Sequence, residues 1–337
     1  MHTQTLMEEG NPASPVALIV GVTGMVGIAL TEALNKPTAL GGPWTVYGVS
    51  RRSLPPWFPS SLLNNYLILD TLNQEETQKL LSPLSSKVTH LFWVAISVNE
   101  SEEVNISLNS TMLSNVLNTL TSSQDSKLRH VTLQTGTKQY MGPVFDPSLS
   151  AKLVPHDPPF REDYPRIPFP NFYYALEDIV ASYPKSFTYS IHRSSIIIGA
   201  SSRSFFNELL TLSVYALICI LAISTAGNTF GMGLWRVLCD AFDVEFVPFD
   251  ENEKFDFVDY MKDKEEVWDR IVEENGLYKT KLKEITCVDA SNAILKFEFQ
   301  HVCSMNKSRE FGFLGFENTL ASIVVWVERL KQMNILP

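Results

Sequence analysis

The sequence GVTGMVG at residues 21–27 follows an apolar run at residues 16–20 and precedes residues 28–35, where apolar side chains recur at helical spacing. This pattern indicates a buried strand that turns directly into a helix. In such a turn the first glycine permits the tight bend, the second lets the main chain approach phosphate oxygens, and the third lets the helix lie against the strand. These glycines are Gly21, Gly24 and Gly27. In this context the spacing predicts a dinucleotide site.

The end of the next apolar run, residues 45–49, indicates which dinucleotide binds. An acidic residue at this position usually accepts hydrogen bonds from the ribose hydroxyls of NAD, whereas a 2′-phosphate requires cations. Here the run is followed by Ser50, Arg51 and Arg52. The two arginines therefore predict NADPH as the cofactor. The alternative is an ordinary solvated arginine pair in a surface loop.

Strands and helices continue to alternate along the first two hundred residues. Apolar strands fit residues 66–69, 88–95 and 129–134, and residues 107–120 have a helical period. This alternation predicts a doubly wound parallel sheet, an α/β fold of the Rossmann type. Ligands of such sheets bind beyond the carboxyl ends of the strands.

That rule points to several strand ends as parts of the binding site. They are Ala95, residues 134–138 and residues 197–199. Asp70 and Thr71 follow another strand, and the Asp70 carboxylate either accepts a hydrogen bond from the adenine amino group or forms an ordinary turn.

Composition favours an enzyme that acts on a small molecule. The net charge of −10 over 337 residues argues against nucleic acid or an anionic membrane surface as the main partner. Four widely spaced cysteines suggest neither a zinc site nor a disulfide framework. Residues 1–15 read as a flexible tail without a secretory signal, so we expect a cytoplasmic protein. A homodimer is left open.

Residues 209–223 are almost wholly apolar, and residues 224–228 read as a turn. A membrane helix usually needs about 20 apolar residues, and this run is shorter. We therefore expect a buried helix, or a helix that runs into a buried strand, with a membrane span as the weaker alternative. The division that follows is residues 16–200 as an NADPH-binding Rossmann domain and residues 201–337 as a smaller, mainly helical substrate lobe interleaved with the core.

Two side chains stand out as candidates for chemistry. Tyr173 opens a probable helix, and Lys138 follows the strand at residues 129–134. Short-chain dehydrogenases commonly pair a tyrosine with a lysine four residues later, but that position holds Glu177. A carboxylate cannot lower the pKa of a phenol as an ammonium does. Either Tyr173 is an interface aromatic, or its cationic partner is Lys138.

At this point the sequence resembles the plant progesterone 5β-reductase and iridoid synthase-like enzymes, an atypical branch of the short-chain dehydrogenases. The combination of NFYYxxED with a separate TGxKxY is diagnostic because the usual Tyr-x-x-x-Lys is missing. The matching phrases are GVTGMVG (21–27), GGPWTVYGVSRR (41–52), LQTGTKQYMGP (133–143), HDPPFREDYPR (156–166), NFYYALEDI (171–179) and SMNKSREFGFLGF (304–316).

The resemblance implies NADPH-dependent reduction of the activated carbon–carbon double bond of a small apolar enone or enal, such as a 3-oxo-Δ4-steroid or 8-oxogeranial. Carried onto matching positions, Tyr173 is the catalytic phenol and Lys138 its partner. The implied cofactor contacts are Thr23, Gly24, Met25, Arg51, Arg52, Asp70, Thr71, Ala95, Gln134, Tyr173 and Ile197, with Ser204, Phe205 and Phe206 covering the cofactor. Aromatic residues that suggest an apolar substrate are Phe145, Phe160, Phe169, Phe205, Phe206, Phe313 and Phe316. The alternative for these residues, and the commoner role of aromatic side chains, is a place in the core.

The chain departs from the family pattern at three places. Ser194 stands where the family has proline, and Ile96 replaces a tryptophan that often follows the strand. A further strand, loop and helix are missing near Cys219, which shortens the substrate lobe. These departures motivate a second hypothesis, an NADPH-binding protein with impaired or no turnover. A third hypothesis, an ordinary alcohol or ketone dehydrogenase, is disfavoured by Glu177.

Overall fold

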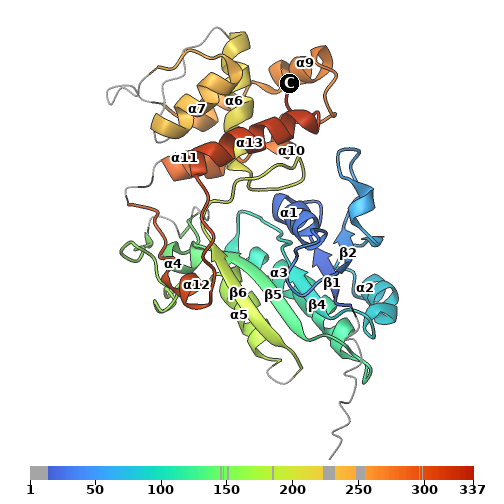
Figure 1. Ribbon diagram of the computed structural model, residues 1–337. Coiled ribbons are helices and arrows are strands. Elements are labelled where there is room, and N and C mark those ends of the chain that lie inside the picture. Colours follow the sequence, from blue (N-terminus) through green and yellow to red (C-terminus); the bar gives the residue numbers. More distant parts are fainter. Residues whose placement is uncertain are drawn as a thin grey trace, which may run out of the picture.

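Six parallel strands form one sheet in the order β3-β2-β1-β4-β5-β6 (Figure 1). The computed structural model describes residues 14–337 except residues 145, 147, 150, 151, 184, 185, 223–231, 248–254, 296 and 298. The strands are β1 (Val16–Val20), β2 (Thr45–Ser50), β3 (Asn65–Ile68), β4 (His90–Trp93), β5 (His130–Gly136) and β6 (Thr188–Ser194). The order runs outward from β1 in both directions, which confirms the doubly wound Rossmann-type sheet.

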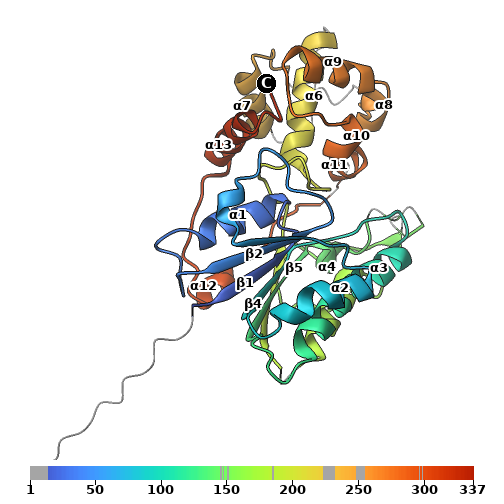
Figure 2. The same cartoon turned by 90° about the vertical axis from the view of Figure 1, so that its right-hand side faces the viewer.

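The two faces of the sheet are covered by different helices (Figure 2). On one face lie α2 (Gln74–Leu81), α3 (Glu102–Thr121) and α5 (Phe172–Ala181), and their apolar side chains share a core with Leu18 and Val20 of β1. On the other face lies α1 (Met25–Leu34), where Ile28 packs in a core that includes Ile19. Successive strand residues point to opposite faces, so β1 contributes to both cores.

A helical lobe stands beyond the sheet on the side of α1 (Figures 1 and 2). It contains α6 (Glu208–Ala222), α7 (Met232–Phe242), α8 (Phe257–Met261), α9 (Glu265–Glu274), α10 (Leu282–Ile285), α11 (Val288–Leu295) and α13 (Thr319–Gln332). Its apolar side chains belong to the same core as Ile19 and Ile28, so the lobe and this face of the sheet are packed as one body. The short helices α4 (Lys138–Met141) and α12 (Asn306–Glu310) lie outside the lobe.

The apolar segment after residue 208 is a buried helix. Along α6 the side chains of residues 209–219 are buried, and the Tyr215 ring packs against Trp235 and Phe257. The alternative of a strand beginning at Leu221 is wrong for residues 221–222, because both belong to α6. The turn expected at residues 224–228 lies outside the described residues. Within the described part of the chain, every helix is too short or too polar to span a membrane.

The last helix, α13, packs against α6 and α7 and forms an ion pair with α1 through Arg329 and Glu32. It therefore connects the rest of the lobe to α1. On α9, the acidic side chains at residues 265, 266, 269, 273 and 274 are exposed, as expected for a solvated helix face.

Candidate active site

A cleft of about 740 Å³ opens at the carboxyl ends of the strands and is bordered by the helical lobe. The residues expected at the site that line it are Gly21, Thr23, Gly24, Met25, Gly27, Arg51, Arg52, Thr71, Ala95, Gln134, Lys138, Tyr173, Ile197, Ser204, Phe205 and Phe206. Asp70 does not line the cleft. Its Oδ1 accepts a hydrogen bond from the Leu72 N–H at 3.1 Å, so Asp70 forms the ordinary turn that was the alternative to a contact with adenine.

The glycine loop holds its backbone close to the neighbouring strand. Gly21 has a φ of +95°, and a Cβ atom there would lie 2.9 Å from the Ala95 nitrogen. A Cβ on Gly27 would lie 2.4 Å from the Gly21 carbonyl oxygen, whereas one on Gly24 would meet only contacts of 3.3 Å and longer. Gly21 and Gly27 are thus required by packing, whereas Gly24 lines the cleft without a side chain.

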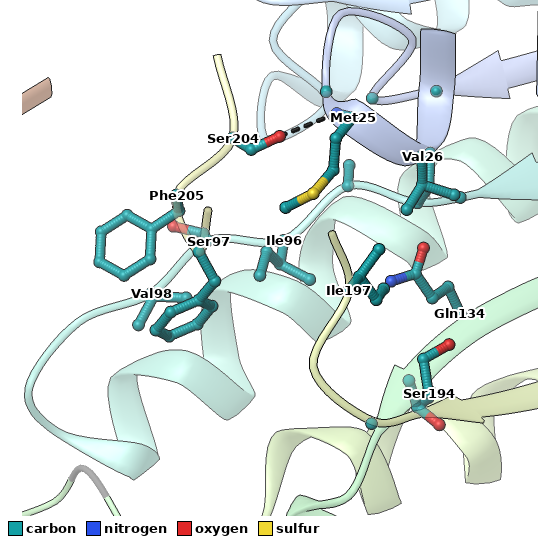
Figure 3. Close-up of a pocket in the computed structure, with 18 of the residues that line it drawn as sticks. Met25, Val26, Ile96, Ser97, Val98, Gln134, Ser194, Ile197, Ser204 and Phe205 are labelled. Carbon is teal, nitrogen blue, oxygen red and sulfur yellow. Dashed lines mark hydrogen bonds between the residues drawn. The ribbon is translucent and has the colours of Figure 1, made fainter. Parts of the chain in front are cut away.

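A loop from the start of the lobe is bonded to this glycine loop. The Met25 N–H, at the N-terminus of α1, donates to the Ser204 hydroxyl at 2.8 Å (Figure 3). Ser201 donates to the carbonyl oxygen of Thr23 at 2.8 Å. Figure 3 also shows Met25, Ile96 and Ile197, from three separate segments, around one space. Ser204 therefore covers the helix terminus where phosphates bind in such folds.

Substitutions of Gly27 and Gly24 distinguish a glycine that is required for packing from one that is required for the approach of the dinucleotide. Gly27→Ala should lower the free energy of unfolding by about 1–3 kcal/mol, because its Cβ would overlap backbone atoms. Gly24→Ala should change it by less than about 1 kcal/mol, since Gly24 has an ordinary φ of −76°, yet weaken dinucleotide binding. Urea denaturation and fluorescence titration measure the two effects. Equal destabilisation by both variants would contradict the distinction.

A group of three arginines lines one part of the cleft: Arg51, Arg52 and Arg203. Burial and the positive charges of Arg203 and Arg51 lower the pKa of Arg52. The Arg203 Nη1 atom is buried without a hydrogen-bond partner, and its Nη2 donates to the Tyr278 hydroxyl at 3.2 Å. None of the carboxylates in the described residues forms an ion pair with these guanidinium groups. The charge of Glu284, which lines the same cleft, acts on Arg52 in the opposite direction and raises its pKa. Three clustered cations that form no ion pair among the described residues are suited to bind an anion.

Sequence reasoning did not find Arg203. It lies about 150 positions after Arg52 along the chain, in a serine-rich loop whose composition indicates only a turn.

Tyr173 and Lys138 meet at the base of the cleft. The side chain of Asn171 accepts from the Tyr173 N–H at 3.0 Å and donates to the Lys138 carbonyl oxygen at 2.8 Å, so one residue fixes both backbones. The Lys138 ammonium lies 6.0 Å from the centre of the Tyr173 ring and 4.4 Å from that of Phe172. Gly136 leaves room for the phenol, since a Cβ there would lie 3.2 Å from its oxygen.

The Tyr173 hydroxyl forms no hydrogen bond with any residue that the structure describes. Burial and the negative charge of Glu102 both raise the pKa of Tyr173. The phenol is therefore a neutral, unused hydrogen-bond donor at the cleft.

Glu102 is the partner that sequence reasoning missed. Its Oε2 accepts from the Lys138 ammonium at 2.6 Å, and its Oε1 accepts from the Phe172 N–H, at the start of α5, at 2.7 Å. The side chains of Glu102 and Lys138 are 3% and 12% exposed. Burial lowers the pKa of Lys138, while the charge of Glu102 and its hydrogen bond oppose that shift. The pair thus keeps a buried lysine charged.

Replacing Glu102 by glutamine should destabilise the protein and shift its pH profile. Breaking a buried ion pair costs about 3–5 kcal/mol. Without the carboxylate the pKa of Lys138 falls further, and activity that requires the ammonium is lost as pH rises through that pKa. The alkaline fall in kcat should therefore move to lower pH. The exposed neighbour Glu103→Gln is the control. An unchanged pH profile would contradict this role.

Glu177 is paired with arginines and forms no hydrogen bond with Tyr173 or Lys138 among the described residues. Its carboxylate is buried and accepts two hydrogen bonds from Arg193, at 3.0 and 2.9 Å, and lies 3.6 Å from Arg166. This bidentate pair joins α5 to β6. The carboxylate that replaces the usual lysine is therefore neutralised and packed into the scaffold.

The expectation that many aromatic residues line the site is wrong in several places. Phe205 and Phe206 line the cleft, but Phe160 is buried in a separate cluster with Tyr140 and Met141. Phe313 and Phe316 are 57% and 89% exposed in the segment after α12 and do not reach the cleft. Phe169 does not line it either, and Phe145 lies outside the described residues.

Comparison with known proteins adds relatives of nearly full length. The model of the PRISE-like Rossmann-fold domain matches residues 68–216. The (S)-8-oxocitronellyl enol synthase of Camptotheca acuminata is 39% identical over 370 aligned positions, which cover 96% of this chain and 93% of that enzyme. The 3-oxo-Δ(4,5)-steroid 5β-reductase of Arabidopsis thaliana is 37% identical, over 98% of this chain and 96% of that enzyme.

Both relatives contain residues that have no counterpart in this chain. The alignment with the Camptotheca enzyme has 370 positions and that with the Arabidopsis enzyme has 381, whereas the chain has 337 residues. Among solved structures, the enzyme WbmH of Bordetella bronchiseptica, determined in complex with NAD⁺, superposes with a TM-score of 0.54 over 94% of this chain and 98% of that one. At 15% identity, this likeness concerns the fold alone.

Proposed function

The chain belongs to the family of the (S)-8-oxocitronellyl enol synthases and 3-oxo-Δ4-steroid 5β-reductases, and we propose that it uses NADPH to reduce the activated carbon–carbon double bond of an enone or enal. The observation that carries this proposal is the pair of polar side chains that line the cleft near the end of β5. There an unpaired phenol, Tyr173, and a buried ammonium, Lys138, lie together. They are suited to a substrate oxygen that gains negative charge.

The cleft suits NADPH in shape and charge. Gly24 places no side chain between the cleft and the N-terminus of α1, which favours the pyrophosphate. Arg51, Arg52 and Arg203 form a cationic group suited to the 2′-phosphate, and the unpartnered Arg203 Nη1 has a hydrogen to donate. When bound, NADPH supplies the hydride that reduces the double bond.

Tyr173 and Lys138 act on the carbonyl end of the substrate. Reduction at the β-carbon pushes negative charge onto the carbonyl oxygen as an enolate forms. Tyr173 remains protonated at neutral pH because its pKa is raised, so it donates a hydrogen bond to that oxygen. The Lys138 ammonium, kept charged by Glu102, stabilises the same charge. Neither group has to remove a proton.

The same electrostatics disfavour the ordinary dehydrogenase reaction. An alcohol dehydrogenase of this type needs a tyrosine that gives up its proton readily. Here burial and Glu102 raise the pKa of Tyr173. The position of the usual lysine holds Glu177, a carboxylate paired with Arg193, so no cation is supplied from there. The site is therefore built for a neutral phenol.

A panel of substrates tests the proposal. NADPH consumption is measured with progesterone, 8-oxogeranial and 2-cyclohexen-1-one, and NADPH binding is measured separately by fluorescence titration. We expect turnover of at least one compound, with the carbonyl group retained in the product. Binding of NADPH without any turnover would overturn the proposed reduction. It would favour the alternative of a binding protein, which is motivated by the segments that the relatives have and this chain lacks.

The division into a nucleotide domain at residues 16–200 and a substrate lobe at residues 201–337 is part of this proposal. It is supported by the position of the lobe beyond the sheet (Figure 1) and by the cleft, which residues of both parts line. The cytoplasmic location and the homodimer stay predictions.

A further inference from the structure

A second polar group lines the cleft, on the wall formed by the lobe. Glu208 is the first residue of α6, and it lines the cleft together with Cys287, Ala290 and Ile294, which lie on α11 or immediately before it. Ala290 and Ile294 make the surroundings of Glu208 largely apolar, and the lobe adds one more carboxylate to the cleft, the exposed Glu284. The catalytic pair comes from α5 and the start of α4, so Glu208 belongs to a different part of the same cleft.

Glu208 is buried, and only half of its carboxyl group has partners. The residue is 8% exposed. Its Oε2 accepts a hydrogen bond from the Ser291 hydroxyl at 2.7 Å and a longer one from the Cys287 thiol at 3.8 Å. Its Oε1 is buried and has no hydrogen-bond partner. Among the described residues no lysine, arginine or histidine forms an ion pair with it.

A buried carboxyl oxygen without a partner is unfavourable in a protein alone. In native proteins such a group calls for an explanation, and one explanation is a site whose hydrogen bonds are completed only when its ligand is bound. Glu208 lines the cleft, so its side chain borders the space that a ligand would occupy. Ser291 fixes the orientation of the carboxyl group by holding the other oxygen.

On the basis of the proposed function, we propose that Glu208 binds a hydroxyl group of the substrate, so that the preferred substrate is an enone or enal that carries a hydroxyl group away from its double bond. A hydroxyl group can both donate and accept a hydrogen bond. It can therefore form a hydrogen bond with Oε1 whether or not the carboxyl group carries a proton.

The protonation of Glu208 favours a hydroxyl group over other polar groups. Burial raises the pKa of Glu208 to about 7, so both forms of the carboxyl group occur near neutral pH. A second carbonyl group on the substrate would pair with the protonated form alone, and an ammonium group with the ionised form. In this proposal Glu208 determines which substrate is preferred, and Tyr173 and Lys138 remain the residues that stabilise the charge on the reacting carbonyl oxygen.

Pairs of substrates that differ only in a terminal hydroxyl group test this inference. We would measure kcat and KM for straight-chain 2-enals of six to twelve carbons and for the same enals with a hydroxyl group on the last carbon. At the chain length that brings the hydroxyl group to Glu208, the hydroxylated enal should have a kcat/KM at least about tenfold higher than its parent, mainly through a lower KM.

Two variants assign the preference to Glu208. Glu208→Leu should remove the tenfold preference without weakening NADPH binding, and Glu208→Gln should keep part of it because an amide still forms hydrogen bonds. The matched control is Glu266→Leu, since Glu266 is an exposed carboxylate on α9 that does not line the cleft. Thermal unfolding checks that each variant is folded.

The outcomes separate this inference from the proposed function. If the wild type reduces the enals but shows no preference at any length, or if Glu208→Leu keeps the preference, the inference on Glu208 is overturned and the reductase function stands. If the wild type reduces none of the enals or enones while it binds NADPH, the proposed function itself is overturned and the inference on Glu208 falls with it.

Discussion

Replacing Tyr173 with phenylalanine is expected to lower kcat by about 10²-fold or more, which is the loss measured when one oxyanion-hole donor is removed. The hydroxyl forms no hydrogen bond within the described residues, so its removal leaves no protein group unsatisfied. The ring remains packed against Gly136. Stability and NADPH affinity should therefore stay near those of the wild type, and the loss should fall on the chemical step.

The neighbouring residue provides a matched control. Tyr174 donates to the Gln139 carbonyl oxygen at 2.9 Å and accepts from the Ile167 N–H at 3.0 Å. Tyr174→Phe should therefore reduce the free energy of unfolding by about 1–3 kcal/mol because it leaves a buried N–H and a carbonyl oxygen without partners. Its kcat should change little. Near-wild-type kcat for Tyr173→Phe would reject the catalytic role.

Reversing the charge of both Arg51 and Arg52 to glutamate is expected to weaken NADPH binding by about 10²–10³-fold, because two charge-assisted contacts with the 2′-phosphate are replaced by repulsion. NADH lacks that phosphate, so its affinity should change far less. Fluorescence titration with each cofactor measures the ratio directly and does not depend on turnover.

Arg161 offers the control for this charge reversal. It is an exposed arginine that pairs with Asp163 outside the cleft. Arg161→Glu should leave the ratio of the two affinities unchanged. If the Arg51/Arg52 variant keeps the wild-type preference, the 2′-phosphate is bound elsewhere and the interpretation of this strand end is wrong.

The sheet could be predicted because its signals are local. The apolar run of β1, the glycine loop and the helical period of α1 follow one another within twenty residues, and each obeys simple spacing rules. The ends of helices and strands were predicted less accurately. The helix α3 begins at Glu102, five residues before the expected start, because its first turn is polar and carries no apolar period.

The electrostatics of the site could not be predicted in the same way. Glu102 reaches Lys138 across 36 positions, and in sequence it reads only as an acidic residue in a first helical turn. Glu177 could be recognised as a replacement for lysine, but its neutralisation by Arg193 depends on how α5 packs on β6. Such pairs arise from tertiary packing, which residue spacing does not encode.

The most direct test of the central claim follows the hydride. NADPH labelled with deuterium at the transferable position of the nicotinamide ring is incubated with the enzyme and an accepted enone or enal, and the product is examined by NMR and mass spectrometry. We predict deuterium on the β-carbon of a saturated product that retains its carbonyl group. Deuterium on the former carbonyl carbon, in an alcohol that keeps its double bond, would contradict the account.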